Sequence, residues 1–280
     1  MTIEIQSLRQ TELPSALTLH ASVGSNPGLS DLRVLLACDP DCVLAIRQDD
    51  RLLGFITVVR YPWFNAFVSI PVVAVEAQGR GLEKQLLSTA LKRLAGYNVG
   101  ADVPKAYLSL FEGAGFSEHL SVTMHTGILT PPEEMIPGIV PSAGVNHGSL
   151  AAYDTTSFCR ERGALLKQWC AAPGAICVCA VSGSVVVGYA VARPLKRGMG
   201  IGPLFANDER TARKLIQSVA DEIPLNSAIH CCVPSSNPSA ASLVSSLGLV
   251  QGERYTRMFT DFNPVPDYSR WFFTASAEIG

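Results

Sequence analysis

A proline-rich segment near the middle of the chain sets the strongest limit on its fold. Residues 131–141 (PPEEMIPGIVP) contain four prolines, which lack a backbone N–H for a strand ladder and favour extended chain. The segment predicts a linker at 131–143 between an N-terminal domain at 1–130 and a C-terminal domain at 144–280. A chain of 280 residues agrees with two domains, because one domain commonly holds about 100–200 residues.

The two halves show a matching order of predicted elements. In the first half, hydrophobic periodicity predicts strands at 3–8, 42–47, 52–61, 64–75, 97–103 and 120–129, and helices at 11–22, 30–37, 79–95 and 105–113. The second half repeats the later part of that order, with helices at 160–170, 208–222 and 237–247, a hairpin within 175–192, and strands at 228–233 and 255–260. We therefore expect an α/β fold with a mixed sheet, built as two tandem modules.

Composition and charge exclude several classes of function. The net charge is −2 and the chain has no run of lysines or arginines, so we expect no nucleic-acid or membrane partner. Charged residues make up only 16%, against about 25% in typical soluble domains, which indicates apolar surface at a ligand cleft or at an interface of a homo-oligomer. Residues 175–192 carry no charge, but Ser-Gly-Ser at 182–184 predicts a hairpin there and not a membrane helix.

Eight cysteines indicate the compartment. The first ten residues lack the apolar stretch of a secretory signal, so we expect a cytoplasmic protein with reduced thiols. Cys177 and Cys179 lie two residues apart in one predicted strand, and Cys231 and Cys232 adjoin in another. No second pair at zinc spacing accompanies them, which favours buried core thiols over a metal site.

The stretch from Val73 to Lys84 is the most informative for function. A buried strand ends, a turn with Gly79 and Gly81 follows, and an amphipathic helix begins. Backbone N–H groups at a helix start bind anions, and glycines allow a phosphate to approach them closely. Arg80 adds a cation, so this pattern predicts a phosphate or pyrophosphate site; the alternative is a plain glycine turn before a helix.

This stretch resembles the GNAT superfamily of acyl-CoA-dependent N-acetyltransferases. After a strand, its members carry Arg or Gln, two residues, Gly, one residue, and Gly or Ala; Gln78, Gly81 and Glu83 occupy these three positions. The resemblance extends over the whole chain, particularly to the YitH-like two-domain branch. It includes GADVP at 100–104, GF at 115–116, IGPLFA at 201–206, VP at 233–234 and RM at 257–258.

The resemblance implies a site in the first domain. Acetyl-CoA would lie across a pair of splayed strands, with its pantetheine arm beside Val73 and its pyrophosphate on the N–H groups of Gly79, Arg80, Gly81, Leu82 and Glu83. A small amine would then attack the thioester directly. The candidate catalytic residues are Asp102 and His125, as base or ammonium ligand, and Tyr107 as the acid for the departing thiolate. For each of them the alternative is a purely structural role.

Three departures from the family pattern leave the function open. Glu83 places a negative charge where the family has Gly or Ala, Pro71 removes a strand N–H near the thioester, and Phe111 stands at the position of the usual tyrosine. Residues 207–214 of the second domain lack glycine, so its cofactor motif is degenerate. The leading hypothesis is an acetyl-CoA-dependent N-acetyltransferase. The alternatives are a GNAT-like enzyme performing CoA-independent cyclisation or condensation, and a non-catalytic GNAT-like protein.

Overall fold

Two folding units share the chain, and each collects segments that are distant in the sequence. The computed structural model describes residues 3–130, 136–158 and 160–280. Unit 1 is drawn from Met1–His119, Thr256–Asn263 and Ala277–Gly280, and unit 2 from Leu120–Tyr255 and Pro264–Ser276. Residues 120–129, assigned to the N-terminal domain from the sequence, lie in unit 2. Part of the expected linker, 131–135, lies outside the described residues.

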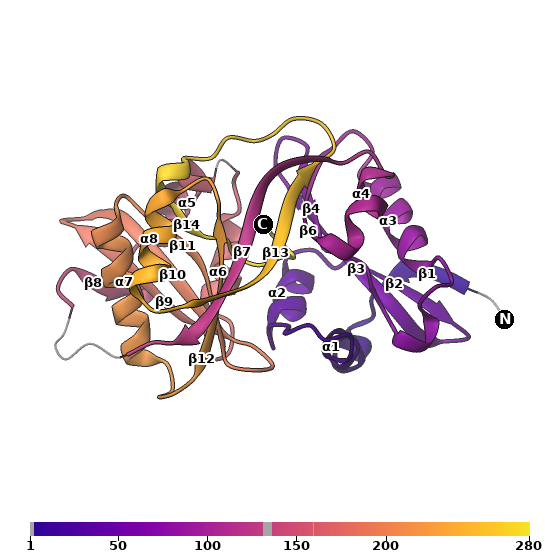
Figure 1. The fold of residues 1–280 in the computed structure, drawn as a ribbon, viewed down its shortest axis with the longest axis horizontal. Coiled ribbons are helices and arrows are strands. Elements are labelled where there is room, and N and C mark those ends of the chain that lie inside the picture. The colour runs from indigo at the N-terminus through magenta and orange to yellow at the C-terminus, as the bar shows by residue number, and fades with distance from the viewer. Residues whose placement is uncertain (1–2, 131–135, 159) are drawn as a thin grey trace. The chain divides into compact units, whose positions relative to one another are not determined.

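Unit 1 is a sheet with helices on both faces (Figure 1). Its elements in chain order are β1 (Ile3–Ser7), η1 (Gln10–Glu12), α1 (Leu13–Ser22), α2 (Asp31–Cys38), β2 (Val43–Gln48), β3 (Arg51–Tyr61), β4 (Asn65–Val68), β5 (Val72–Val73), η2 (Val75–Ala77), α3 (Leu82–Arg93), β6 (Asn98–Pro104), η3 (Lys105–Tyr107) and α4 (Leu108–Glu112). The strand order is β1-β2-β3-β4-β6-β13, where unit 1 receives the last residues of β13 (Val250–Phe259).

The helices of unit 1 bury the apolar stripes that their sequences predict. On α3, Leu82, Leu86, Leu87 and Ala90 are buried in a core that also takes in Phe111 and Phe116. Burial of such a stripe stabilises a helix more than its intrinsic propensity does. Helix α1 packs on β3 with the ring of His20 against the edge of Phe55, whose side chain lies outside the α3 core.

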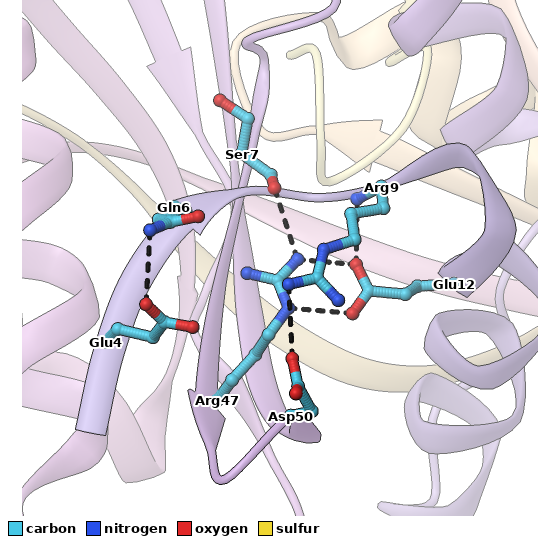
Figure 2. Close-up of polar contacts among 7 residues, drawn as sticks. All are labelled: Glu4, Gln6, Ser7, Arg9, Glu12, Arg47 and Asp50. Carbon is cyan, nitrogen blue, oxygen red and sulfur yellow. Dashed lines mark hydrogen bonds and ion pairs between the residues drawn. The ribbon is translucent and has the colours of Figure 1, made fainter. Parts of the chain in front are cut away.

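A buried arginine fastens the N-terminal segment to the sheet, as Figure 2 shows. The side chain of Arg47 on β2 is fully buried, donates from Nε to Glu12 Oε1 at 2.7 Å, and donates from Nη2 to the carbonyl of Ser7 at 3.2 Å. The hydrogen bond from Arg47 holds the pKa of Glu12 below its usual value. The outer ion pair of Arg9 and Asp50 is exposed and contributes little to the stability of the fold.

An irregularity on one strand opens the sheet of unit 1. The expected strand at 64–75 is divided: β4 pairs with β3 up to Val58 and Val68, and β5 resumes at Phe55 and Val72. One strand thus uses one residue more than its partner, which is a bulge. Pro71, which has no N–H for the ladder, lies in this bulge, and Ser69 bridges it by accepting at Oγ from the N–H of Thr57 at 3.0 Å.

Strands β4 and β6 part just before the bulge. Their parallel pairing runs from Asn65 and Asn98 to Phe67 and Gly100. From there β6 continues to Pro104, while β5 stays with β3. The two strands diverge on the side where the chain turns into α3, as the resemblance implies for a splayed pair.

Unit 2 repeats this arrangement. Its elements are β7 (Ser117–Ile128, from Leu120), β8 (Ile139–Pro141), η4 (Ser142–Gly144), α5 (His147–Phe158), α6 (Gly163–Cys170), β9 (Ile176–Ser182), β10 (Val185–Pro194), β11 (Met199–Ala206), α7 (Glu209–Glu222), β12 (Ala228–Pro234), α8 (Pro238–Ser246), the first part of β13, η5 (Tyr268–Arg270) and β14 (Trp271–Phe273). The strand order is β7-β12-β11-β10-β9-β8, and β14 pairs with β11.

The uncharged stretch of unit 2 forms the predicted hairpin. Strands β9 and β10 pair antiparallel around Gly183, which adopts a φ of +61° that glycine tolerates best. Within the described residues, no helix has the length and apolarity needed to span a membrane.

Candidate functional site

The turn before α3 presents an exposed, glycine-based helix start. Gly79 and Gly81 both adopt a φ of +73°, and a Cβ added at either would meet no atom within 4 Å. Gly81 caps α3 through its backbone alone. Because the first N–H groups of a helix have no partner within it, the residues that follow direct their amides toward the open side of this turn. The turn combines accessible amides with the positive end of a twelve-residue helix.

Neighbouring side chains hold the turn in place. Gln78 folds back and donates from Nε2 to the carbonyl of Val73 at 3.3 Å. Val73 itself lies opposite Gly54 on β3, where a larger residue would collide with the carbonyl of Val72. Arg80 donates to the side chain of Gln48 at 2.8 Å and is exposed, so its guanidinium lies at the surface beside the turn.

Two other predicted residues, Glu83 and Tyr107, come together next to this turn. Glu83 lies in the first turn of α3, and Tyr107 ends η3 just before α4. Burial, and after it the negative charge of Glu83, raise the pKa of Tyr107. Tyr107 therefore keeps its proton at neutral pH. Phe111, in contrast, is fully buried and packs edge to face on Phe116 at 5.0 Å, so it is a core residue.

Asp102 lies on β6 and forms a buried ion pair with a residue that is distant in the sequence. Arg257 donates from Nε to Asp102 Oδ1 at 2.7 Å and from Nη2 to Oδ2 at 2.6 Å, and both side chains are 3% exposed. The guanidinium also lies 5.1 Å from the centre of the Phe67 ring. Such two-pronged pairing fixes the position and orientation of the carboxylate.

His125 belongs to the other unit. It lies on β7 opposite Cys231 of β12, and its Nδ1 is 3.1 Å from the carbonyl of Thr123. The structure thus joins Tyr107 with Glu83 in unit 1, places Asp102 with Arg257 on the same sheet, and assigns His125 to unit 2. Within the described ranges, no group of three or more His, Cys, Asp or Glu side chains is placed to bind a metal.

The matching position in unit 2 is filled by the chain itself. Strands β11 and β12 pair in parallel only at Met199 with Ile229 and at Gly200 with His230. Strand β14 then enters between them: Phe273 pairs with Leu204 of β11, and the N–H of Thr274 donates to the carbonyl of Cys232 on β12 at 2.8 Å. A strand of the protein thus occupies the place that corresponds to the opening between β4 and β6 in unit 1.

Sequence reasoning missed two of these residues, Arg257 and Ser69, and one strand, β14. Arg257 carries no local signal for a partner 155 positions away, and Ser69 is an ordinary strand residue until its backbone irregularity is known. The sequence predicts no helix or strand for the aromatic run at 271–273, which forms β14.

Comparisons with known proteins agree with this architecture. Residues 150–273 match the model of the acetyltransferase (GNAT) domain. These residues of the chain thus resemble a GNAT domain. A holothin acyltransferase from Pseudoalteromonas sp. (strain SANK 73390) is 22% identical over 253 residues, which cover 90% of this chain and 86% of that protein.

Solved structures extend the likeness in fold to both units. A putative acetyltransferase from Pyrococcus horikoshii superposes with a TM-score of 0.84 at 17% identity, covering 99% of this chain and 96% of that one. A tandem GNAT protein from the clavulanic acid biosynthesis pathway, determined without AcCoA, has a TM-score of 0.65 at 14% identity over 94% of this chain and 100% of its own. At these identities the likeness shows the fold, and the tandem GNAT architecture predicted from the sequence is confirmed.

Proposed function

We propose that unit 1 binds acetyl-CoA at the start of α3 and transfers its acetyl group to a small amine. The observation that carries this proposal is the exposed turn with two left-handed glycines, Gly79 and Gly81, at the point where β4 and β6 have parted. An anion such as a pyrophosphate is bound well by helix N-terminal amides. The turn fits this group, because nothing stands over either glycine.

Glu83 is the residue that opposes this assignment. Its carboxylate lies in the first turn of α3, and its negative charge contributes, after burial, to the raised pKa of Tyr107. The charge of Glu83 disfavours a second negative charge nearby but helps to keep Tyr107 protonated. We infer that the chain gives up some affinity for the anionic donor while retaining a proton source next to it.

The proposed chemistry divides among few residues. Acetyl-CoA supplies a thioester carbon that a neutral amine can attack. The amides from Gly79 to Glu83 hold the diphosphate, and the strand edge at Val73 aligns the extended arm. Tyr107 holds the proton that a departing thiolate requires, a role that commonly contributes about 10²–10⁴ in rate. Asp102 is held by Arg257, and we assign it to positioning β6.

Titration calorimetry with acetyl-CoA tests the binding half of the proposal. We expect saturable binding to the wild type and an affinity about 2- to 5-fold higher for Glu83→Gln. The substitution removes a negative charge that repels the diphosphate at the helix start, where a single charge is worth about 0.3–1 kcal/mol. Glu76→Gln is the matched control, since Glu76 pairs with Arg51 at the surface of the same turn. Absence of a binding heat at millimolar acetyl-CoA would refute the proposal.

The acceptor is proposed from the curated relative. That protein's name describes acyl transfer to holothin, which supports a small-molecule acceptor here. Release of free CoA should be followed with a panel of small amines, with holothin included. A cytoplasmic location is part of this proposal, on the cysteine content already described.

A second candidate, CoA-independent chemistry on the same scaffold, is favoured by Pro71 and Phe111. Pro71 is buried and offers no N–H beside the bulge, and Phe111 offers no proton. This candidate predicts that a small organic substrate binds unit 1 while acetyl-CoA does not, so the same calorimetry separates the two.

A further inference from the structure

Three cysteines of unit 2 meet at one point on the sheet. Cys170 is the last residue of α6, and Cys177 and Cys179 lie on β9. Residues two apart on a strand point to the same face. Val178 and Ala180 point to the other face, into the core that contains α7, so the two β9 cysteines face the side of α6.

The sulfur atoms of two of these cysteines are almost within bonding distance. Cys170 Sγ lies 2.7 Å from Cys177 Sγ, compared with about 2.05 Å in a disulfide. Only five residues, 171–175, connect the end of α6 to the start of β9, so the main chain already holds the two residues together. Closing the bond requires a small movement of side chains rather than a rearrangement of the backbone.

The surroundings differ between the two sulfurs. Hydrogen bonds from Cys170 and Cys179, helped by Ser142 and the charge of His147, lower the pKa of Cys177 to about 4 against the opposing effect of burial. The hydrogen bond to Cys177 and burial raise the pKa of Cys170. Cys177 is 8% exposed and Cys179 is fully buried, whereas Cys170 is partly exposed. One sulfur is thus accessible, and the other is a sheltered thiolate aimed at it.

We propose that Cys170 and Cys177 form a redox-active thiol pair that a low-molecular-weight disulfide oxidises to an intramolecular disulfide. Cys170 loses its proton, attacks one sulfur of the reagent RSSR, and releases one thiolate. The Cys177 thiolate then attacks Cys170 Sγ and releases the second. The protein loses two electrons and the one proton of Cys170. RSSR is reduced to two thiolates, one of which takes up the Cys170 proton while the other takes a proton from water.

Oxidised glutathione provides the test on the full-length reduced protein. After alkylation of the remaining thiols, intact mass and peptide mapping should show the loss of two hydrogen atoms and a bond between Cys170 and Cys177. Cys177→Ser should stop at a mixed disulfide on Cys170, and Cys170→Ser should leave Cys177 unmodified. Cys232→Ser, a half-buried cysteine of β12 in the same unit, is the matched control and should form the bond like the wild type.

Several results would overturn the proposal. One is a wild-type protein that stops at a mixed disulfide on Cys170, or in which Cys170 and Cys177 both remain alkylatable. Another is a disulfide that maps to a different pair. A third is the binding of one zinc ion per chain that protects all three thiols from alkylation, since this would identify a metal site instead.

Discussion

Replacing Asp102 with asparagine separates a structural role for this residue from a catalytic one. The carboxylate receives two hydrogen bonds from Arg257, at 2.7 and 2.6 Å, and both side chains are 3% exposed. Asparagine keeps the size of the side chain but removes its charge. The guanidinium of Arg257 then stays buried between Phe67 and β6 without its counter-charge.

The expected loss of stability is large. Removing one partner of a buried ion pair costs about 3–5 kcal/mol, because the remaining charge is uncompensated. Each 1.4 kcal/mol changes an equilibrium tenfold, so opening of β6 should increase roughly 100- to 4,000-fold. The exposed pair of Arg51 and Glu76, with 68% and 56% of their side chains accessible, supplies the contrast: Glu76→Gln should cost less than about 1 kcal/mol.

Hydrogen exchange measured by mass spectrometry on peptides from β6 reports this opening directly. Urea denaturation of the same variants gives the global stability. The double variant Asp102→Leu with Arg257→Met should recover much of the loss, because buried ion pairs are often replaced by apolar residues at little cost.

The reasoning fails if Asp102→Asn exchanges and unfolds like the wild type. If such a stable variant also lost acetyl transfer while it still bound acetyl-CoA, Asp102 would be the catalytic base and Arg257 only its holder. A large loss of stability that the double variant does not restore would also contradict the ion-pair account.

Three further predictions concern the helix start, the proton source and the filled position in unit 2. Gly81→Ala should lower stability by about 1–2 kcal/mol and weaken acetyl-CoA binding, since alanine disfavours a φ of +73°; Gly144→Ala, at an open position with ordinary φ, should do neither in thermal unfolding and calorimetry. Tyr107→Phe should lower kcat about 10²–10⁴-fold with acetyl-CoA affinity unchanged, and an unaltered kcat would exclude this tyrosine as the acid. In Gly202→Ala the new Cβ would stand 1.9 Å from the carbonyl oxygen of Thr274, so β14 should exchange its amides faster, whereas protection equal to the wild type would refute its close seating.

Much of the fold was predictable because local patterns agree with the tertiary structure. The apolar stripe of α3 is buried as its spacing indicates, and the uncharged stretch with its Ser-Gly-Ser turn forms the largely buried hairpin of β9 and β10. Helix α5 was missed: its residues carry no strong amphipathic pattern, and it follows the proline-rich segment directly. The expected strand at 64–75 was too long, because Pro71 and Ser69 interrupt its pairing.

The candidate site was only partly predictable. The positive φ at the glycines of the α3 turn can be predicted from the local sequence, since glycine is the residue that most readily adopts it. The pairing of Asp102 with Arg257 depends on residues 256–263 joining unit 1, and nothing near either residue indicates this. The sequence therefore predicts Asp102 as a candidate site residue from its place near a strand end, but it does not predict the pairing with Arg257. The roles of Asp102, Tyr107 and His125 stay predictions.

Strand β14 makes the two halves of the tandem unequal. Because it is tethered to the rest of the chain, its effective local concentration between β11 and β12 is set by the length of its connections, typically on the order of millimolar for short tethers, and does not fall on dilution. A dissolved molecule at micromolar levels competes poorly with such an occupant. In this duplicated fold, one half therefore keeps an opening between its strands, while the corresponding opening of the other half is occupied by its own chain.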